Sequence, residues 1–394
     1  MSYKSGYGFP SDVYFDTERI HRLHNNKWFF VATRGDLPKV RNYFEFDLLG
    51  ESYFLVHGKD GDIRGYVNRC AHQSARLVAD QTGKCGARII CPNHQWAFDM
   101  TSGELVRGAG MPAGFEKCAE GKAVYLNRIS VSEVDGLIFA CLNPDATRKD
   151  LDKIADLIAP YTGPFNLGGG DYKLAYHRRE IVDASWLSVM INNRECNHCA
   201  QNHKQLLQLF DASSFNGTMT PEYDTLLKAA QKRWNEKGLK WEEQAFTVSD
   251  QCRVARYPLA KGFQSITFDG EPASKKLIGP HIETGYDEGT LSLWLNPNAW
   301  IHMTSDHIAT NWVLPIDAER CELYTSWIVH KDAVEGIDYT KKHMTDVWHV
   351  TNAEDVTLCK SMTQGTKSKH YRPGPFSPIE KFCTQFCDWY MKYS

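Results

Sequence analysis

Cys70-Ala71-His72 and, after 18 intervening residues, Cys91-Pro92-Asn93-His94 are the stretches that decide the fold of the first half of this chain. Each stretch offers one thiolate and one imidazole, so the two together form a four-ligand metal site. Zinc fingers favour halves that carry two cysteines or two histidines at wider spacings. One Cys and one His in each half instead indicate a [2Fe–2S] cluster with histidine on one iron, which raises its reduction potential by roughly hundreds of millivolts.

The unequal spacing, Cys-x-His against Cys-x2-His, resembles the Rieske cluster motif. Gly83 and Gly86 between the two halves suit a tight turn. Trp96 and Phe98 follow the second half and are suited to shield a cluster from water. The ligands that the motif predicts for the [2Fe–2S] cluster are Cys70, His72, Cys91 and His94.

The length of 394 residues predicts two domains. A hydrophobic content of 42% and a charged content of 24% are those of an ordinary globular protein that buries a large core. The formal net charge of −3 gives no reason to expect nucleic acid or an anionic membrane as a partner. The first 30 residues lack an apolar signal region, and no apolar run of about 18 residues follows. We therefore expect a cytoplasmic protein.

Twelve cysteines in this length are too dilute for a disulfide scaffold. Two of them are the predicted cluster ligands. The remainder are interpreted as small buried apolar residues. This group includes Cys85, Cys118, Cys141, Cys252, Cys321, Cys359, Cys383 and Cys387.

The pattern of the first half predicts a small antiparallel β domain with the cluster loops at its tip. A short amphipathic helix is expected over residues 16–27 and a buried strand over 28–32. Further short strands, punctuated by Gly, Asn and Asp, are expected at residues 53–56, 65–67, 88–90, 123–126 and 137–141. Residues 146–171, with charge, proline and three successive glycines, suit a connection into the second domain.

A helix that opens at Ser185-Trp186 leads into a second candidate metal site. Glu195 and His198 lie three residues apart and share a helix face, whereas His203 follows five residues after His198. An ideal helix would turn His203 about 140° away from His198, so both imidazoles reach one ion only across a bend or broken turn. Two histidines with one further carboxylate form the triad of non-haem iron enzymes, which leaves positions open for O2.

The rest of the second half is predicted to combine helices with antiparallel strands. Helices are expected at residues 204–210, 223–240 and 338–362, and strands at 291–294, 299–303, 308–314 and 323–329.

Along nearly the whole chain these motifs resemble the large subunit of Rieske non-haem iron oxygenases. Three stretches look like the branch that oxidises quaternary ammonium compounds. They are Asn192-Asn193-Arg194-Glu195-Cys196, the segment from Val329 to Gly336, and the ending Pro373-Gly374-Pro375-Phe376-Ser377-Pro378.

The resemblance implies an α+β fold assembled as a homotrimer. An all-β Rieske [2Fe–2S] domain is expected at residues 46–160, and a helix-grip catalytic domain, an antiparallel sheet with helices, at residues 161–394. Residues 1–45 are expected to pack on the catalytic domain as an N-terminal segment.

The resemblance also implies roles for the residues of the second site. His198, His203 and Asp355 would hold Fe(II), with Glu354 as the rival carboxylate. Glu195 would be the bridge that passes electrons from the cluster of one subunit to the iron of its neighbour. It would contact His198 in its own chain and His72 or His94 across the interface.

A quaternary ammonium group neither donates hydrogen bonds nor coordinates iron, so its pocket must hold it by cation–π contacts. Candidate walls are Phe210, Trp294, Trp300 and Trp312. Relatives commonly carry Tyr where Asn197 stands and Pro where Lys204 stands. Lys204 beside a cationic substrate would be unhelpful unless it points to solvent.

Two functions follow from these expectations. The first is a terminal oxygenase that uses O2 to hydroxylate and N-demethylate a betaine-type substrate with release of formaldehyde, with ring or other amine hydroxylation as the alternative chemistry. Its electrons would come from a separate flavin- and iron–sulfur-containing NAD(P)H reductase, because no dinucleotide fingerprint follows a strand here. The second is a Rieske electron carrier, which needs only about the first 150 residues.

Overall fold

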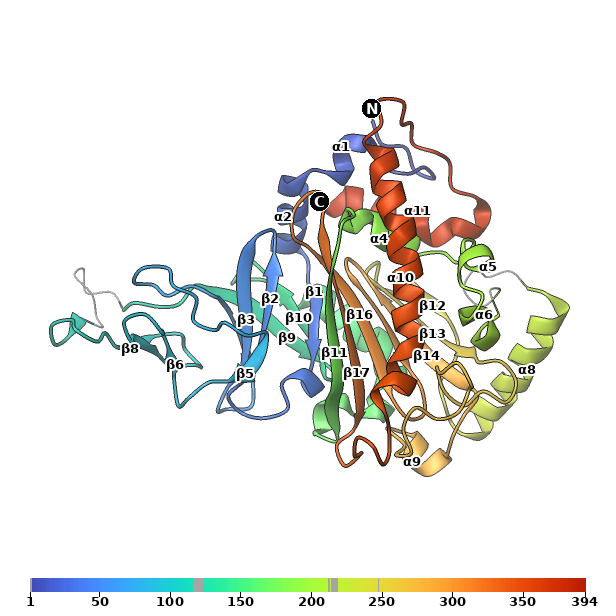
Figure 1. Cartoon of the computed structure of the whole chain (residues 1–394), viewed down its shortest axis with the longest axis horizontal. Helices are drawn as coiled ribbons and strands as arrows, with labels where there is room; N and C mark the ends of the chain where they lie inside the picture. The colour runs from blue at the N-terminus through green and yellow to red at the C-terminus, as the bar shows by residue number, and fades with distance from the viewer. Residues whose placement is uncertain (1, 116–122, 212, 214–218, 247) are drawn as a thin grey trace.

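The computed structural model describes residues 2–115, 123–211, 213, 219–246 and 248–394. In these residues the strands form two seven-stranded sheets and one three-stranded sheet (Figure 1). This is the predicted α+β architecture, with a β-rich first half followed by a sheet covered by helices. Of the helices in this part of the chain, none combines the length and apolar character that crossing a membrane requires.

The first large sheet has the strand order β1-β10-β9-β4-β3-β2-β5, with antiparallel neighbours throughout. Its strands are β1 (Phe29–Thr33), β2 (Asn42–Leu48), β3 (Glu51–His57), β4 (Ile63–Val67), β5 (Thr82–Lys84), β9 (Arg128–Val134) and β10 (Leu137–Cys141). A small sheet of β6 (Ile89–Ile90), β7 (Ala97–Phe98) and β8 (Leu105–Arg107) projects beyond it to the far end of the molecule (Figure 1).

The second large sheet is also antiparallel, in the order β11-β17-β16-β15-β14-β13-β12. Its strands are β11 (Tyr172–Val182), β12 (Gln244–Ala245), β13 (Cys252–Pro258), β14 (Gly289–Leu295), β15 (Ala299–Met303), β16 (Ile308–Pro315) and β17 (Cys321–His330).

Side chains along these strands alternate between the two faces of the sheet, and each face packs against a different layer. One face packs against the first sheet. There Trp312 stacks on Tyr324 with ring centroids 4.9 Å apart and meets the edge of Phe30 at 5.4 Å. The other face carries Trp294 and Trp300 and lies under the helices. The second sheet therefore lies between the first sheet and the helical layer.

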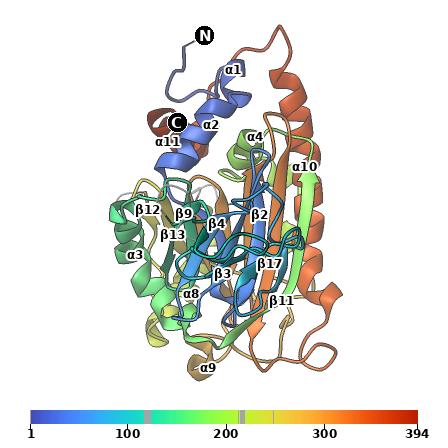
Figure 2. The same cartoon turned by 90° about the vertical axis from the view of Figure 1, so that its left-hand side faces the viewer.

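Helices cover the outer face of the second sheet, with α10 running along it beside β11 (Figures 1 and 2). The helices are α1 (Ser11–Tyr14), α2 (Thr17–Asn26), α3 (Lys149–Thr162), α4 (Trp186–Asn192), α5 (Cys199–Asn202), α6 (Leu206–Leu209), α8 (Pro221–Glu236), α9 (His281–Thr284), α10 (Lys341–Thr366) and α11 (Lys381–Tyr393). Short 3-10 turns are η1 (Arg34–Asp36), η3 (Gly163–Phe165), η4 (Leu167–Gly169) and η5 (Pro378–Glu380).

The N-terminal helix α2 forms where the apolar periodicity predicts it. Asp16 caps it by accepting a hydrogen bond from the Arg19 backbone N–H at 2.9 Å. Its buried Ile20 and Leu23 join the apolar cluster of α4 and α11. By contrast β1, which lies in the same expected segment, pairs with β10 of the first sheet. The domain boundaries at residues 45 and 160 stay a prediction.

Several predicted elements are confirmed and two are wrong. The strands at 137–141 and 299–303 and the helix near 223–240 lie where predicted. The described residues 123–126 form no strand, because only Tyr125 makes a bridge, to Glu104. Residues 146–171 are more than a connection, since α3 buries Leu151 and Ile158 against the sheet core. The long strand β11 and helix α11 were not anticipated.

The predicted burial of the cysteines is largely confirmed. Cys85 is half-buried, and Cys118 lies outside the described residues. The buried ones are Cys141, Cys252, Cys321, Cys359, Cys383 and Cys387.

Candidate active site

The helix that precedes the second metal motif stops before it reaches the histidines. α4 ends at Asn192, a tight turn follows, and α5 spans only Cys199–Asn202. His198 stands just before α5 and His203 just after it. This break is what the spacing of five residues required, because it turns both imidazoles toward one point. Their ring centroids lie 5.1 Å apart.

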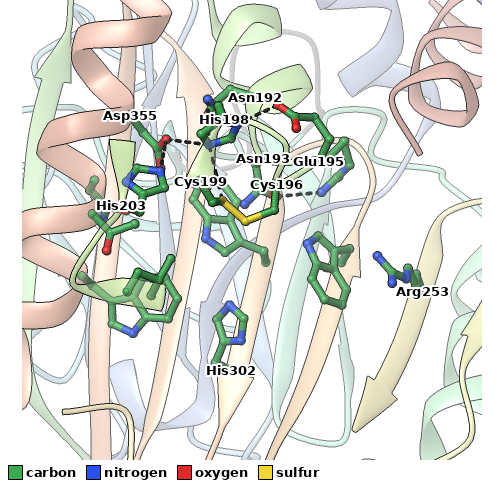
Figure 3. Close-up of a pocket in the computed structure, with 17 residues that line it drawn as sticks. Asn192, Asn193, Glu195, Cys196, His198, Cys199, His203, Arg253, His302 and Asp355 are labelled. Carbon is green, nitrogen blue, oxygen red and sulfur yellow. Dashed lines mark hydrogen bonds and ion pairs between the residues drawn. A yellow bond between two sulfur atoms is a disulfide. The ribbon is translucent and has the colours of Figure 1, made fainter. Parts of the chain in front are cut away.

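Three donor atoms converge at that point, two from this segment and one from α10. His203 Nε2 lies 2.9 Å and His198 Nε2 lies 3.2 Å from the same atom, Asp355 Oδ1 (Figure 3). Two imidazoles and one carboxylate are the donor set of the non-haem iron triad, so these residues fit Fe(II). The structure thus brings together the three residues that the sequence assigned to the iron.

The outer nitrogen of each imidazole faces a second carboxylate. His198 Nδ1 donates to Glu195 Oε1 at 2.6 Å, and His203 Nδ1 donates to Glu354 Oε2 at 2.7 Å. Such contacts hold the rings in the tautomer that leaves Nε2 free for a metal. Glu354, the rival of Asp355, therefore lies behind His203 and not beside both Nε2 atoms. The geometry favours Asp355 as the metal-binding carboxylate.

The pKa values of the two histidines and of Asp355 reflect the close contacts between imidazoles and carboxylates at the site. Burial lowers the pKa of His198, but hydrogen bonds with Asp355 and Glu195 outweigh it and raise the pKa to about 9. For His203, too, burial opposes the effect of Asp355 and Glu354, and the net pKa is raised. Burial raises the pKa of Asp355, yet the two imidazoles hold it below its usual value. Without a metal, protons balance the negative charge there.

A disulfide between Cys196 and Cys199 spans the backbone of His198. Cys199 Sγ lies 3.9 Å from His198 Nε2, close enough to belong to the group of potential metal-binding atoms. Because this sulfur is bonded to Cys196, it offers no thiolate to a metal. The expectation that all cysteines outside the cluster are simply small buried residues is therefore wrong for this pair, for which the Cys-x2-Cys spacing was a signal.

A pocket opens beside the three converging donors and is floored by the second sheet. Arg253, Trp294 and Trp300 are direct partners across β13, β14 and β15, so their side chains form one row on the same face. His302 lies on the same face of β15 and stacks on Trp348 of α10, with ring centroids 4.7 Å apart. The pocket is lined by Asn192, Asn193, Arg194, Glu195, Cys196, His198, Cys199, His203, Leu206, Arg253, Trp294, Trp300, His302, Trp348, Thr351, Asn352 and Asp355 (Figure 3).

Two of the four aromatic residues predicted as walls line this pocket, namely Trp294 and Trp300. The prediction for Trp312 is wrong, because the adjacent Asn311 is the register partner of Trp300 and the period of two turns Trp312 to the opposite face. Phe210 is buried in the layer behind the pocket, with its ring 6.4 Å from His302, and does not line it.

Sequence reasoning missed several lining residues, among them Arg253, His302 and Trp348. Nothing in their local sequence sets them apart, because only the strand register and the α10 packing bring them to the site. Lys204, which would repel a cationic substrate, is exposed and outside the pocket lining. Asn197 donates its backbone N–H to Glu195 Oε2, so it helps to hold that carboxylate.

The two halves of the cluster motif form the same turn twice. Cys70 N–H donates to the Ala75 carbonyl at 2.9 Å, and Cys91 N–H donates to the Trp96 carbonyl at 2.8 Å. Residues Ser74 and Gln95 occupy equivalent places, with φ of 58° and 57°. This pairing presents the two halves of the motif as matching loops, as four ligands of one cluster require.

The ligands on these loops divide by exposure. Cys70 and Cys91 are buried, and the Cys70 thiol lies within hydrogen-bonding reach of Cys91. His72 and His94 are exposed, with ring centroids 4.7 Å apart, and His72 stacks on Trp96 at 4.5 Å. Two adjacent thiols below and two adjacent imidazoles above fit a [2Fe–2S] cluster whose histidine-bound iron faces outward.

Comparison with protein-family models gives matches over both halves of the chain. Residues 27–118 match the Rieske [2Fe–2S] domain, and residues 169–394 match the ring hydroxylating alpha subunit catalytic domain. The first of these holds a [2Fe–2S] cluster and the second a mononuclear iron, so the two cofactors predicted from the motifs are those of the matched domains.

Two of the curated relatives match nearly the whole chain. It is 31% identical to the glycine betaine monooxygenase oxygenase subunit of Chromohalobacter salexigens, covering 98% of this chain and 85% of that one. It is 24% identical to the carnitine monooxygenase oxygenase subunit of Escherichia coli K12, covering 92% and 85%.

Solved structures share the fold. The quaternary ammonium Rieske monooxygenase CntA in complex with L-carnitine has a TM-score of 0.67 at 18% identity, covering 99% of this chain and 96% of that one. Naphthalene 1,2-dioxygenase from Rhodococcus sp. has a TM-score of 0.65 at 17% identity, covering 98% and 93%.

Replacing each acidic residue of α10 separates the metal-binding carboxylate from the orienting one. We expect Asp355→Asn to abolish iron retention at the second site, because it removes the only carboxylate oxygen beside both Nε2 atoms in the described residues. Glu354→Gln should weaken iron binding by about 10- to 100-fold, the usual cost of losing an orienting partner. Iron per chain measures this, with the visible spectrum of the cluster as the folding control. Iron lost in Glu354→Gln but kept in Asp355→Asn would reverse the assignment.

The raised proton affinities predict how iron loading depends on pH. A ligating imidazole must be neutral, so iron has to displace a proton from His198 at any pH below about 9. Apparent Fe(II) affinity should therefore rise with pH toward about 9, and loading at neutral pH should release protons. Titration calorimetry in buffers of different ionisation enthalpy measures the release. Glu195→Gln removes one cause of the raised pKa of His198 and should let the affinity level off at a lower pH, whereas an affinity independent of pH in the wild type would contradict this account.

Proposed function

We propose that this chain, which belongs to the family of ring hydroxylating alpha subunits with a Rieske [2Fe–2S] domain, is the terminal oxygenase that hydroxylates and N-demethylates a quaternary ammonium compound. The product chemistry follows from the bond attacked. A hydroxyl placed on a methyl carbon attached to nitrogen gives a carbinolamine, which collapses to formaldehyde and the demethylated amine.

One observation carries this proposal: the two histidines and Asp355 converge at a pocket walled by indole rings. Trp294, Trp300 and Trp348 all line it. A quaternary ammonium group is attracted to the faces of such rings, an interaction worth about 2 kcal/mol or more when water is excluded. Trp294 and Trp300 are 5% exposed each, so contacts made there are largely dry. The substrates in the names of the curated relatives, glycine betaine and carnitine, are of this chemical class.

The protein's own residues supply positioning and exclude water. When bound, the cluster delivers single electrons and the mononuclear iron activates O2. His198, His203 and Asp355 would hold that iron at the wall of the pocket. The indole walls would hold the cation with a methyl group toward the metal. The ammonium group needs no hydrogen-bond donor from the protein, so the indole faces of Trp294, Trp300 and Trp348 suffice to hold it.

The electron path is proposed to run between subunits. In one chain the small sheet that carries the cluster loops lies at the opposite end of the molecule from α5 (Figure 1). Transfer therefore requires a neighbour, which suits the expected homotrimer. Glu195 would take the receiving role; in support, its carboxylate accepts a hydrogen bond from His198 Nδ1 and its side chain is 12% exposed. A flavin- and iron–sulfur-containing NAD(P)H reductase would reload the cluster through the exposed His72 or His94.

Two other functions remain to be distinguished. Hydroxylation of an aromatic ring is the chemistry named for part of this family, and the indole walls would accept a ring as well as a cation. A pure electron carrier would leave Glu195, Asp355 and the two ligand histidines without a role. About three irons per chain are expected for the oxygenase and about two for the carrier.

The substrate class is tested by O2-dependent formaldehyde release with a surrogate reductase. We expect release with one or more of glycine betaine, carnitine, choline and stachydrine, because each presents N-methyl groups on a quaternary nitrogen. Coupling between substrate, O2 consumed and formaldehyde formed should be close to one. Naphthalene and anthranilate serve as the competing class. Ring hydroxylation without any formaldehyde release would remove the proposal in favour of the alternative.

Glu195→Ala tests the bridge. Because Glu195 also orients His198, the variant is loaded with excess Fe(II); we then expect both metals to be present and turnover to fall by at least about 100-fold, since a carboxylate contact on the electron path is lost while the iron-binding atoms stay. The matched variant is Glu354→Gln, which removes the orienting partner of the other imidazole. Once loaded with iron it should still pass electrons. Reduction of the iron by a pre-reduced cluster in a single turnover gives the readout, and normal reduction in Glu195→Ala would remove the bridging role.

A further inference from the structure

Arg253 is a buried cation at the wall of the pocket. It is 4% exposed, and its guanidinium lies between the rings of Phe382 at 3.8 Å and Trp294 at 4.4 Å from their centroids. Its Nε donates to Glu243 at 2.9 Å, and its Nη2 donates to the Tyr257 hydroxyl. These contacts fix the plane of the guanidinium and use only part of its five donors.

Arg194 brings a second positive charge to the same region. It is 3% exposed and lines the pocket, yet its contacts are neutral amides: Asn193 Oδ1 at 3.0 Å and Asn296 Oδ1 at 2.9 Å. Its guanidinium also lies over the Phe386 ring, 5.4 Å from the centroid, and in the described part of the chain its acceptors are amide oxygens only and its Nε is buried without a hydrogen-bond partner. Burial lowers the pKa of Arg194, and the nearby charge of Arg253 lowers it further. A buried cation of this kind calls for an anion.

The two ends of the pocket therefore carry opposite charges. Asp355 and His203 lie on one side of it and Arg253 on the other, with His302 between them (Figure 3). At the arginine end Arg253 pairs with Glu243, whereas among the described residues Arg194 has only amide oxygens as hydrogen-bond acceptors, which leaves a positive charge in excess. At the metal end the carboxylates dominate. Between the two ends lie the indole rings of the sheet row.

From this arrangement we infer that Arg253 binds a carboxylate of the substrate, with Arg194 supplying a second positive charge behind it. The inference rests on the proposed function and adds the residue that distinguishes a betaine from a quaternary ammonium compound without a carboxylate. A zwitterion would enter with its carboxylate at Arg253 and its ammonium against Trp294 and Trp300. That orientation directs an N-methyl group toward the side of Asp355 and the histidines. A cation that lacks the carboxylate would leave the excess positive charge at the arginine end without a counter-ion.

The decisive comparison removes the negative charge from the substrate and the positive charge from the protein in turn. Glycine betaine and carnitine are assayed beside their methyl esters, which keep the ammonium group and the shape but lose the charge. In the wild type we expect a KM about 10- to 100-fold lower for each acid than for its ester, the range of a charge-assisted hydrogen bond. Arg253→Gln should erase most of that difference by raising the KM of the acids, while kcat and the KM of the esters change by less than about threefold.

Conservative and matched variants separate binding from structure. Arg253→Lys keeps the charge and should restore part of the preference for the acids. Arg256→Gln is the control, because Arg256 lies on the same strand and is equally buried but points to the opposite face, near Trp234. It should leave the ratio of acid to ester unchanged. Should Arg253→Gln fail to fold, the ratio of acid to ester KM in Arg253→Lys decides in its place: a ratio identical to that of the wild type would overturn the assignment to Arg253.

The outcomes distinguish this inference from the function beneath it. Equal KM values for acid and ester in the wild type, or equal effects of Arg253→Gln on both, would overturn the carboxylate site while demethylation of the esters upheld the proposed function. Absence of formaldehyde from every quaternary ammonium compound would overturn both. Selective loss of the acids in Arg253→Gln supports the inference.

Discussion

The convergence of two imidazoles on one carboxylate oxygen, at 2.9 and 3.2 Å from Asp355 Oδ1, is the contact on which the rest of this molecule depends. It joins residues more than 150 positions apart in the sequence, so it depends on the contacts that hold the two segments in place. α10 is tied to α4 through Thr363, which accepts the Ser185 N–H and donates to Ser188 Oγ, both at 3.0 Å. Asn352 ties the same helix to the sheet through Asn311 and Thr325.

The second sheet makes this convergence possible because its two faces contact different layers. Its inner face is apolar and packs against the first sheet, whereas its outer face supplies the floor of the pocket. A partly buried charge network joins the two sheets at one edge, where Arg179 of β11 binds Glu45 and Asp47 of β2 together with Glu322 of β17. The position of the cluster-bearing domain is thereby set by side chains of the catalytic sheet. Rigid placement matters for a chain whose cluster loops are expected to meet a neighbour's iron.

The site itself combines charges that would be unfavourable in isolation. Carboxylates gather around the histidines at one end and two arginines lie at the other, all largely buried. The carboxylates at the acidic end are compensated by protons or by a metal. The arginines at the basic end are stabilised by amide oxygens and aromatic faces, which compensate their charge only in part. Such incomplete compensation is typical of places built to receive a ligand. It is the reason that metal loading and substrate charge are expected to govern how the pocket behaves.

The sequence by itself determined the chemistry of both metal centres, because metal ligation depends on residue type and spacing that are local. The Cys and His motifs predicted the cluster, and the interval from His198 to His203 predicted the break in the helix. The choice of Asp355 over Glu354 had local support only by resemblance. The walls of the pocket were decided by tertiary structure. Trp300 faces the site and Trp312 faces the core because strand register and the period of two assign them to opposite faces, and Arg253 and Trp348 reach the pocket only through pairing and helix packing between distant segments.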